Sequence, residues 1–303
     1  MEIGLIGLGK MGANMAERLL RGGHKVVGYD RDTQAVKKIT EQGNIGTSSI
    51  DDLISKLKSP KIVWLMVPAG KPVDDTIELL VPKLNRGDII IDGGNSYYKD
   101  SVRRARLLGG HDINMVDAGV SGGVWGLKEG YSIMVGGDKN AVDYLKPIFE
   151  TLAPGKDKGW GHVGPNGAGH FVKMVHNGIE YGLMQAYAEG FHLMKKKTEF
   201  NLDLYQVAEI WRYGSVVRSW LLDLTSTALS DDQDLTKIAP YVADSGEGRW
   251  TALEGIELGV SLPIIAQSLY QRFASQDNEG YGNRLLAMMR HEFGGHAVKG
   301  KEG

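Results

Sequence analysis

The N-terminal segment of this chain contains the motif that most restricts its fold. Ile3–Gly12 reads I-G-L-I-G-L-G-K-M-G, in which Gly7, Gly9 and Gly12 form a G-x-G-x-x-G pattern between an apolar strand and an apparent helix. Gly7 permits a tight turn, Gly9 lets a pyrophosphate approach the backbone, and Gly12 allows close packing of the helix on the strand. The first N–H groups of that helix are available to phosphates. We therefore expect a dinucleotide to contact Gly7, Leu8, Gly9, Lys10, Met11 and Gly12.

An acidic residue favours this interpretation over a glycine-rich turn without a ligand. Asp30 follows Gly7 by 23 residues, at the end of the second predicted strand. A carboxylate there accepts hydrogen bonds from a ribose 2′-hydroxyl and repels a 2′-phosphate, so NAD is favoured. Arg31 either stacks on the adenine, pairs with a 2′-phosphate or is simply solvated, and NADP stays an alternative. The other candidate cofactor contacts, at the ends of later strands, are Val67, Pro68, Ala69 and Asn95.

The rest of the first half alternates apolar runs with helix-like stretches. The expected strands are Glu2–Ile6, Lys25–Tyr29, Ile62–Val67, Ile89–Asp92, Asn114–Ala118 and Tyr131–Gly136. This alternation predicts a mostly parallel, doubly wound α/β sheet of the Rossmann type. A stretch rich in Gly, Pro and Lys at residues 153–169 interrupts the pattern, and helical periodicity follows it. We expect a dinucleotide-binding domain at residues 1–165 and an all-α domain at residues 166–303.

Composition excludes several classes of function. The 35 lysines and arginines nearly balance 37 aspartates and glutamates, so no overall basic field favours nucleic acid. The absence of cysteine excludes disulfides, thiolate zinc sites, iron–sulfur clusters and a cysteine nucleophile. No apolar run has the length of a membrane span and no signal peptide is evident, so we expect a cytoplasmic protein. The eight histidines lack the spacing of metal ligands, and no metal is expected.

One predicted helix of the second half carries an unusual polar stripe, formed by Lys173, His176, Asn177, Glu180 and Tyr181. At helical spacing these residues fall within an arc of about 140°. An ordinary solvated face is the alternative, but such faces are usually rich in Lys, Glu and Arg. The stripe instead has one amine, one carboxyl group and three other hydrogen-bonding side chains. We therefore expect an acid/base site on this helix.

A second glycine cluster follows another predicted strand. Asp117–Gly123 reads D-A-G-V-S-G-G, and ligands of open parallel sheets bind beyond the carboxyl ends of the strands. Ser121 and the amides of Gly122 and Gly123 suit a carboxylate, although an ordinary turn explains the pattern equally well. Asn95, in I-I-D-G-G-N-S, ends a strand in the same way.

Together these motifs resemble the β-hydroxyacid dehydrogenase superfamily. G-L-G-x-M-G-x-N-M-A, D-x-G-V-S-G-G and G-x-G-H-F-V-K-M-V-H-N-G-I-E-Y-G occur in the order typical of it. The last motif, with I-I-D-G-G-N-S-x-Y and the C-terminal F-G-G-H, is similar to the 6-phosphogluconate dehydrogenase family. The resemblance extends through nearly the whole chain, in a short form without the duplicated helical region of the long members.

The resemblance implies oxidative decarboxylation of 6-phosphogluconate to ribulose 5-phosphate and CO2, a reaction of the pentose phosphate pathway, with reduction of NAD or NADP. It makes Lys173 the base for the 3-hydroxyl group and Glu180 the acid that protonates C1 of the enediol. His176, Asn177 and Asn95 would bind substrate hydroxyls. Ser121, Gly122 and Gly123 would hold the carboxylate end.

The phosphate of the substrate would be bound, by the same resemblance, by Tyr181, Arg272, Arg290 and His296. In the family the last two enter the active site of a neighbouring subunit, which implies a homodimer or homotetramer. The chain departs from the long form at Ser245, where a lysine phosphate ligand is usual, so phosphate binding is weaker or relies on Arg249. It also has Val124 where an acid often follows S-G-G.

Two alternatives stay open. A non-decarboxylating member of the superfamily, of the 3-hydroxyisobutyrate dehydrogenase or tartronate semialdehyde reductase type, would lack the set formed by His176, Glu180, Arg290 and His296. Release of CO2 separates it from the decarboxylating enzyme. The alternative from another class is a nucleotide-binding sensor without catalysis, which a turnover assay would identify.

Overall fold

The computed structural model describes residues 1–300, which divide into two compact units, Met1–Asn177 and a second that begins at Gly178. The division falls inside a long helix, α8 (Ala168–Lys196), which begins in the first unit and continues into the second. The boundary expected after residue 165 lies before this helix. The two positions differ because the first turns of α8 pack against the sheet of the first unit, at Gly169 and Lys173.

The first unit is built on one eight-stranded sheet. Its strands are β1 (Glu2–Ile6), β2 (Lys25–Tyr29), β3 (Ile45–Gly46), β4 (Ile62–Leu65), β5 (Ile89–Asp92), β6 (Asn114–Ser121), β7 (Ser132–Gly137) and β8 (Trp160–Gly164). Their order is β3-β2-β1-β4-β5-β6-β7-β8, and β6 and β7 are the one antiparallel pair of this sheet. The direction of winding reverses between β1 and β4, where doubly wound folds form their ligand crevice.

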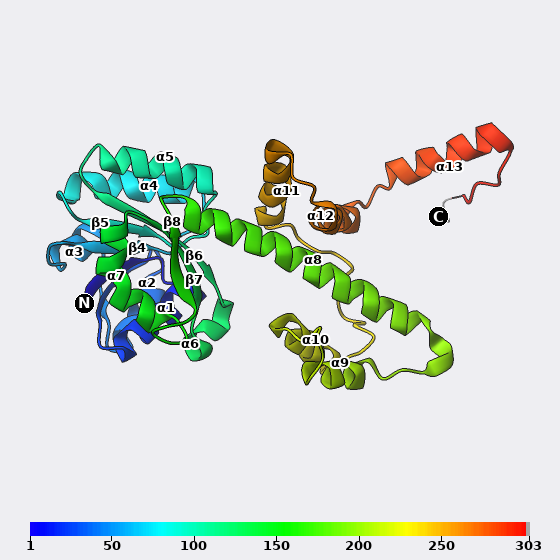
Figure 1. Ribbon diagram of the computed structural model, residues 1–303, viewed down its shortest axis with the longest axis horizontal. Helices are drawn as coiled ribbons and strands as arrows, with labels where there is room; N and C mark the ends of the chain where they lie inside the picture. Colours follow the sequence, from blue (N-terminus) through cyan, green and yellow to red (C-terminus); the bar gives the residue numbers. More distant parts are fainter. Residues whose placement is uncertain (301–303) are drawn as a thin grey trace. The chain divides into compact units, whose positions relative to one another are not determined.

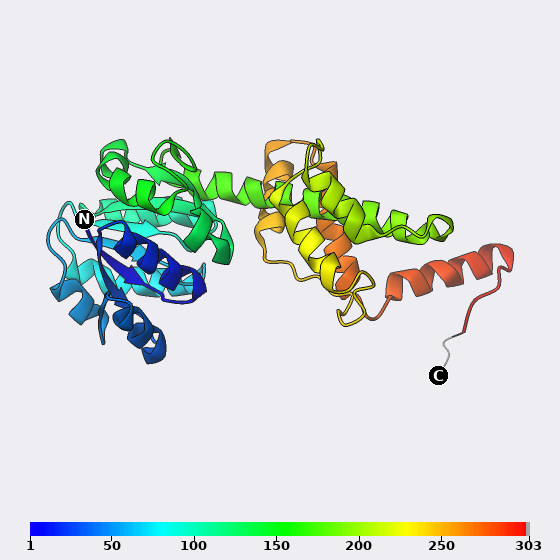
Figure 2. The ribbon, with the colours of Figure 1, turned by 90° about the horizontal axis from the view of Figure 1, so that it is seen from below.

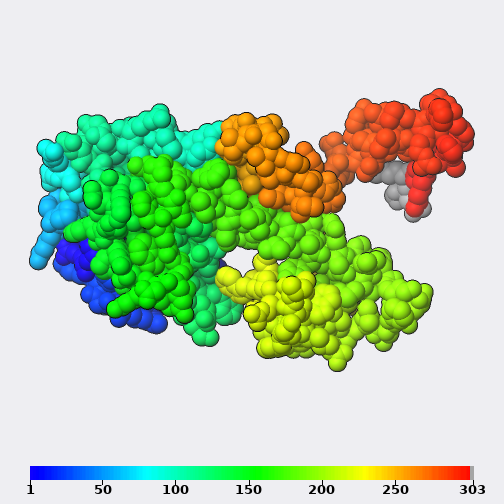
Figure 3. All heavy atoms as spheres, in the orientation of Figure 1, coloured from blue at the N-terminus to red at the C-terminus, as the bar shows by residue number. Residues whose placement is uncertain are grey.

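Helices cover both faces of this sheet (Figure 1). They are α1 (Lys10–Arg21), α2 (Thr33–Glu41), α3 (Ile50–Ser55), α4 (Lys71–Leu80), α5 (Tyr98–Gly109), α6 (Gly126–Glu129) and α7 (Lys139–Leu152), with short 3-10 turns at Val81–Lys83 and Gly123–Trp125. One core joins the sheet to α1, α2 and α7, and a second core joins it to α3, α4 and α5. Figure 3 shows the blue, cyan and green segments of this unit packed closely against one another.

The predicted fold class is confirmed, and β1, β2 and β5 have the predicted bounds. Two strands, β3 and β8, were not among those expected from the sequence. β3 is only two residues long, and β8 lies in the Gly/Pro/Lys-rich stretch, where glycines replace the apolar side chains that mark a strand. The main anchor of β8 is Trp160, whose ring stacks on Phe149 with 5.3 Å between ring centroids.

The second unit is helical, and no strand occurs between Gly178 and Gly300. The helices that follow α8 are α9 (Leu204–Arg212), α10 (Trp220–Asp231), α11 (Glu247–Leu258), α12 (Pro263–Gln276) and α13 (Tyr281–Gly294), with a 3-10 turn at Thr198–Phe200. α9 and α10 pack on the C-terminal part of α8, around Phe191 and Leu222, and Figure 2 shows them in yellow-green and yellow beside it. α13 contains no buried residue. Within residues 1–300, no helix combines the length and apolar character that crossing a membrane requires.

Candidate active site

The three glycines of the N-terminal motif have different surroundings. Gly7 has φ +97°, and a Cβ atom there would lie 2.5 Å from the carbonyl oxygen of Met66. A Cβ atom at Gly12 would lie 2.0 Å from the carbonyl oxygen of Gly7, so this glycine lets α1 pack on the loop. Gly9, at the N-cap of α1, has nothing within 4 Å of its Cβ position. Gly7 and Gly12 are therefore needed for the turn itself, and Gly9 leaves room for the phosphates of a ligand.

A cleft of about 660 Å³ adjoins this loop at the carboxyl ends of β1, β4 and β5. Eight predicted cofactor contacts line it, namely Gly7, Gly9, Met11, Asp30, Arg31, Val67, Pro68 and Asn95. Leu8, Lys10, Gly12 and Ala69 do not line this cleft. The side chain of Leu8 is buried in the core, and Lys10 and Ala69 are exposed. The volume of the cleft, the open glycine loop and the N-terminus of α1 together fit a dinucleotide.

Asp30 is bonded to the glycine loop. One carboxylate oxygen accepts a hydrogen bond from the backbone nitrogen of Leu8 at 2.6 Å, and the other accepts one from Asp32 at 2.8 Å. Because each carboxylate oxygen has two lone pairs, Asp30 can still accept a bond from a sugar hydroxyl. Arg31 beside it is exposed and lines the same cleft. The two residues expected to influence the choice of cofactor are therefore neighbours on one wall.

Asn95 connects the ends of two strands. Its side-chain nitrogen donates to the carbonyl oxygen of Val120 at 3.1 Å, and its side-chain oxygen accepts from the nitrogen of Val120 at 2.9 Å. Its backbone is left-handed, with φ +51°, a conformation that asparagine tolerates. These bonds tie the loop after β5 to β6, one residue before Ser121. The amide of Asn95 thus has a structural function in addition to any contact with a ligand.

A buried ion pair that no sequence motif predicts supports the same loop. Arg104 of α5 is 1% exposed, and its Nη1 lies 3.3 Å from Oδ2 of the fully buried Asp92. Asp92 also accepts hydrogen bonds from Ser96 Oγ at 2.7 Å and from the nitrogen of Gly94 at 3.1 Å. Arg104 reaches α4 as well, where it bonds Asp74. Nothing in the I-I-D-G-G-N-S motif indicates that its aspartate is paired with a distant arginine.

On α8, Lys173, His176 and Asn177 meet at one oxygen atom. Lys173 Nζ donates to Asn177 Oδ1 at 2.6 Å, and His176 Nδ1 lies 2.8 Å from the same oxygen. An amide oxygen only accepts hydrogen bonds, so this network assigns a proton to His176 Nδ1. Three members of the predicted stripe therefore meet at one amide oxygen.

The polar stripe is not a solvated face. Lys173 is 5% exposed and Tyr181 is 4% exposed, and the other three members are half-buried. Ile179, which the helical spacing places on the opposite side, is 52% exposed. Glu180 lies one turn after His176 on the same helix. The burial of polar side chains beside an exposed isoleucine is the reverse of an ordinary surface helix.

The candidate carboxylate site lies at the end of β6. Ser121 is the last residue of the strand and is half-buried. Gly122 and Gly123 follow with φ values of +128° and +51°, which other residues rarely adopt. Val124, at the first departure from the long form, is 55% exposed. The structure thus presents the three predicted residues together on one turn.

In the second unit, Tyr181 is the centre of a polar cluster. Its hydroxyl donates to Asp244 Oδ1 at 3.2 Å and lies 2.9 Å from Ser245 Oγ. The guanidinium carbon of Arg272 lies 3.4 Å from the centroid of the Tyr181 ring. Two predicted phosphate ligands, Tyr181 and Arg272, are therefore in contact. Arg290 and His296 are exposed, and a hydrogen bond of this tail joins His291 Nδ1 to the carbonyl oxygen of His296 rather than to the cluster.

Asp244 also belongs to the cluster, although no motif in the sequence indicates it. It accepts hydrogen bonds from Arg249 at 2.8 Å and 3.0 Å and from the nitrogen of Gly246 at 2.9 Å. Burial alone would raise the pKa of Asp244, but the bonds from Gly246, Arg249 and Tyr181 lower it below its usual value. Arg249, considered above as a substitute for the missing lysine, is thus already paired with a carboxylate.

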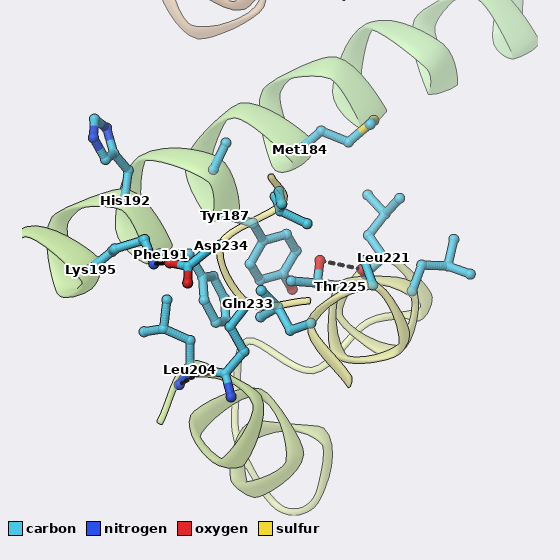
Figure 4. Close-up of a pocket in the computed structure, with 15 residues that line it drawn as sticks. Met184, Tyr187, Phe191, His192, Lys195, Leu204, Leu221, Thr225, Gln233 and Asp234 are labelled. Carbon is cyan, nitrogen blue, oxygen red and sulfur yellow. Dashed lines mark hydrogen bonds and ion pairs between the residues drawn. The ribbon is translucent and has the colours of Figure 1, made fainter. Parts of the chain in front are cut away.

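A separate apolar cleft of about 520 Å³ lies in the second unit between α8, α9 and α10 (Figure 4). Tyr187, Phe191 and Leu221 form part of its wall, and Lys195 and Asp234 form an ion pair at its edge. None of the predicted site residues, all of which the structure describes, lines this cleft. It is therefore not part of the candidate active site.

A doubly wound sheet with a glycine loop, followed by a helical unit, is the fold of a nicotinamide-dependent dehydrogenase. Two family models cover nearly the whole chain: the NAD binding domain of 6-phosphogluconate dehydrogenase matches residues 2–164, and the C-terminal domain of 6-phosphogluconate dehydrogenase matches residues 169–297. The chain belongs to the 6-phosphogluconate dehydrogenase family, as the sequence motifs predicted.

Individual relatives agree with this assignment. The chain is 44% identical over its full length to the whole of the NAD(+)-dependent, decarboxylating 6-phosphogluconate dehydrogenase of Haloferax volcanii. It is 38% identical, over 92% of its length, to the NADP(+)-dependent enzyme of Bacillus subtilis, of which it covers 62%. The solved 6-phosphogluconate dehydrogenase of Plasmodium falciparum superposes with a TM-score of 0.84 at 33% identity, over 100% of this chain and 67% of that one. A 3-hydroxyisobutyrate dehydrogenase of Salmonella typhimurium shares the fold at 21% identity, with a TM-score of 0.76 over 92% of this chain and 95% of that one.

Proposed function

We propose that this chain catalyses the oxidative decarboxylation of 6-phosphogluconate to ribulose 5-phosphate and CO2, with reduction of NAD or NADP. The observation that carries the proposal is the buried amine of Lys173, which bonds Asn177 beside His176 on α8. A buried, hydrogen-bonded amine is a suitable base for a substrate hydroxyl. The relatives named above supply the substrate class, a phosphorylated sugar acid.

The proposed mechanism uses two groups of α8. A dinucleotide bound in the cleft lined by Gly9 and Asp30 would supply the acceptor for the hydride that leaves C3 of the substrate. Lys173 takes the proton of the 3-hydroxyl as the hydride leaves, and as an ammonium group it then polarises the resulting 3-keto oxygen. This polarisation stabilises the enediol that forms when the C1 carboxylate leaves as CO2. Glu180 completes the reaction by giving a proton to the carbon that becomes C1 of ribulose 5-phosphate.

The other polar residues of the site bind the substrate. His176, Asn177 and Asn95 face its hydroxyl groups in this proposal, and Ser121, Gly122 and Gly123 hold its carboxylate end. Tyr181 and Arg272 bind the phosphate, because a guanidinium fork matches phosphate oxygens. This assignment is supported by the contact between Arg272 and the Tyr181 ring.

A second copy of the chain completes the phosphate site in this proposal. Arg290 and His296 are exposed, and α13 has no buried residue of its own. A helix of this length gains little stability without packing, so contact with a neighbouring subunit would stabilise it. We therefore propose a homodimer or homotetramer in which these two residues reach the neighbouring active site.

The proposed cofactor is NAD, with NADP as the alternative. Asp30, which lines the cleft, would accept bonds from the ribose hydroxyl and repel a 2′-phosphate. Arg31 beside it would attract a 2′-phosphate. NAD is therefore preferred only if repulsion of the 2′-phosphate by Asp30 outweighs its attraction to Arg31. Measurement of kcat/KM with both cofactors tests this choice, and a clear preference for NADP would contradict it.

One assay tests the main proposal. Purified protein is given 6-phosphogluconate and either cofactor, and reduced nicotinamide and CO2 are measured together. We expect one CO2 for each cofactor reduced. Reduction without CO2 would indicate a non-decarboxylating dehydrogenase, and no turnover would indicate a sensor. Lys173→Met should abolish oxidation while substrate binding persists, and near-normal turnover of this variant would refute the role of Lys173.

A further inference from the structure

Three glycines bring the start of α8 into backbone contact with the sheet. They are Gly119 of β6, Gly136 of β7 and Gly169 of α8, and we call them the glycine seat. A Cβ atom at Gly169 would lie 2.5 Å from the carbonyl oxygens of both Asp117 and Met134. A Cβ atom at Gly136 would lie 2.7 Å from the backbone nitrogen of Gly169. Side chains at these positions would therefore push the helix away from the sheet.

Asp117 fixes the helix on this seat. The residue is fully buried, and one carboxylate oxygen accepts from the nitrogen of Gly167 at 2.6 Å while the other accepts from that of His170 at 2.9 Å. In the antiparallel pair of β6 and β7, Asp117 is opposite Gly136, and Gly119 is opposite Met134. Residues two apart on a strand share a face, so Asp117 and Gly119 both point to the helix.

Lys173 stands one turn beyond Gly169, directly against Gly119. A Cβ atom at Gly119 would lie 2.3 Å from Cβ of Lys173, 3.1 Å from its Cγ and 2.8 Å from the carbonyl oxygen of Gly169. The first two atoms belong to the base of the lysine stem, which cannot swing aside as the end of the side chain can. The missing side chain of Gly119 is thus the space that the stem of Lys173 occupies.

We propose that Gly119 is a positioning residue for Lys173, and that its bare backbone sets the depth at which the lysine stem lies and hence the place of Nζ. The proposal rests on the function of Lys173 proposed above. A methyl group at position 119 would displace the stem by a large part of an ångström or more. Misplacement of a reacting group by about 1 Å can lower the rate by roughly 100-fold.

Gly119→Ala is the direct test, in the full-length protein with 6-phosphogluconate and the preferred cofactor. We expect kcat to fall by about 10- to 100-fold, with the acid limb of its pH profile displaced, while the dissociation constant of the reduced cofactor changes less than about twofold. If Gly119 had a purely structural role, Gly119→Ala would lower Tm. It would also affect kcat and cofactor binding to a similar extent, and it would leave the pH profile of kcat unchanged. A folded variant with kcat within about twofold of wild type would overturn the proposal.

The matched control is Gly161→Ala in β8. This glycine also lies in a strand of the sheet, and nothing lies within 4 Å of its Cβ position. Its kcat should equal that of the wild type. An equal loss of kcat at both positions would show that any added methyl group disturbs the sheet, and would refute a specific effect of Gly119.

A second comparison applies if Gly119→Ala folds but is too unstable for kinetic measurement. The double variant Gly119→Ala/Lys173→Gly removes the lysine Cβ with which the new methyl group collides. If the Gly119→Ala change lowers Tm much less in the Lys173→Gly background than in the wild type, the space serves Lys173. If Tm falls equally in both backgrounds, the new methyl group collides only with the carbonyl oxygen of Gly169 and not with Lys173. That result would overturn the proposal. This comparison measures Tm and needs no turnover. It can therefore show that Gly119 does not position Lys173 even if the proposed reaction itself is wrong.

Discussion

The backbone nitrogen of Leu8, inside the glycine loop, donates a hydrogen bond of 2.6 Å to the carboxylate of Asp30 at the end of β2. The residue expected to select the cofactor therefore also holds the loop that binds it. Substitution of Asp30 should separate its effect on cofactor choice from its effect on stability. Asparagine removes the charge but keeps an acceptor oxygen for Leu8, whereas alanine removes both.

Asp30→Asn should change the choice of cofactor more than it changes stability. Its side-chain oxygen can still accept from Leu8, while a 2′-phosphate is no longer repelled. We expect the ratio of kcat/KM for NADP to that for NAD to rise by about tenfold, equivalent to about 1.4 kcal/mol. Asp30→Ala should in addition lower the free energy of unfolding by about 1 kcal/mol. Thermal unfolding and steady-state kinetics of both variants measure these effects, and an unchanged cofactor ratio in both would exclude Asp30 as the selector.

Asn177→Asp should move the pH dependence of the reaction. The new carboxylate would lie where Asn177 Oδ1 accepts from Lys173 Nζ at 2.6 Å. A negative charge stabilises the ammonium form, so a higher pH would be needed to obtain the neutral amine that acts as base. We expect the acid limb of the kcat profile to shift to higher pH by about one unit or more. Asn140→Asp, which adds the same charge on the exposed surface of α7, should leave the limb unchanged. A limb that does not move in Asn177→Asp would contradict Lys173 as the titrating base.

Arg290→Ala should weaken binding of the phosphorylated substrate. If this arginine of α13 reaches a neighbouring active site, its loss removes a charge-assisted hydrogen bond of about 1.5 to 3 kcal/mol, and KM should rise by roughly 10- to 100-fold. Arg284→Ala, on the same exposed helix, is the control and should keep the wild-type KM. Mixing Arg290→Ala with a Lys173→Met chain should restore part of the activity if sites are shared between subunits. Unchanged KM in Arg290→Ala would remove this helix from the site.

The sequence predicts the parts of this structure that depend on local pattern and misses those that depend on distant pairing. β1, β2 and β5 are apolar runs bounded by glycine or charge, and their limits agree with the prediction. The glycine motif is likewise local: Gly7 makes the predicted tight turn, and Gly12 lets α1 pack closely, although on the loop at Gly7 rather than on the strand. In contrast, Asn95 bonds Val120 across 25 positions, and Tyr181 bonds Asp244 across 63. No periodicity connects such residues, because the topology of the fold determines which of them meet.

Asp244 should make the stability of the protein depend on pH. Its pKa is lowered in the folded state, against burial, by bonds from Gly246, Arg249 and Tyr181. An acid with a depressed folded pKa stabilises the fold above its unfolded value, taken as 3.8, and this contribution is lost as pH falls through the folded pKa. Asp244→Asn should therefore lower Tm at neutral pH and show a smaller further loss on acidification than the wild type. Asp231→Asn, on an exposed residue of α10, should behave as the wild type in the same scans.

Arg104→Met should destabilise the first unit and disturb the cofactor cleft together. The substitution leaves Asp92 fully buried without its cation, although the bonds from Ser96 and Gly94 persist. Removal of one member of a buried pair typically costs about 3 to 5 kcal/mol. Because Asp92 begins the loop that carries Gly93, Gly94 and Asn95 to the cleft, KM for the cofactor should rise as well. Arg106→Met, two residues further along α5 and exposed, should change stability by less than about 0.5 kcal/mol. Denaturant unfolding with and without cofactor measures both effects, and a stable Arg104→Met variant with normal cofactor KM would show that the pair does not support the loop.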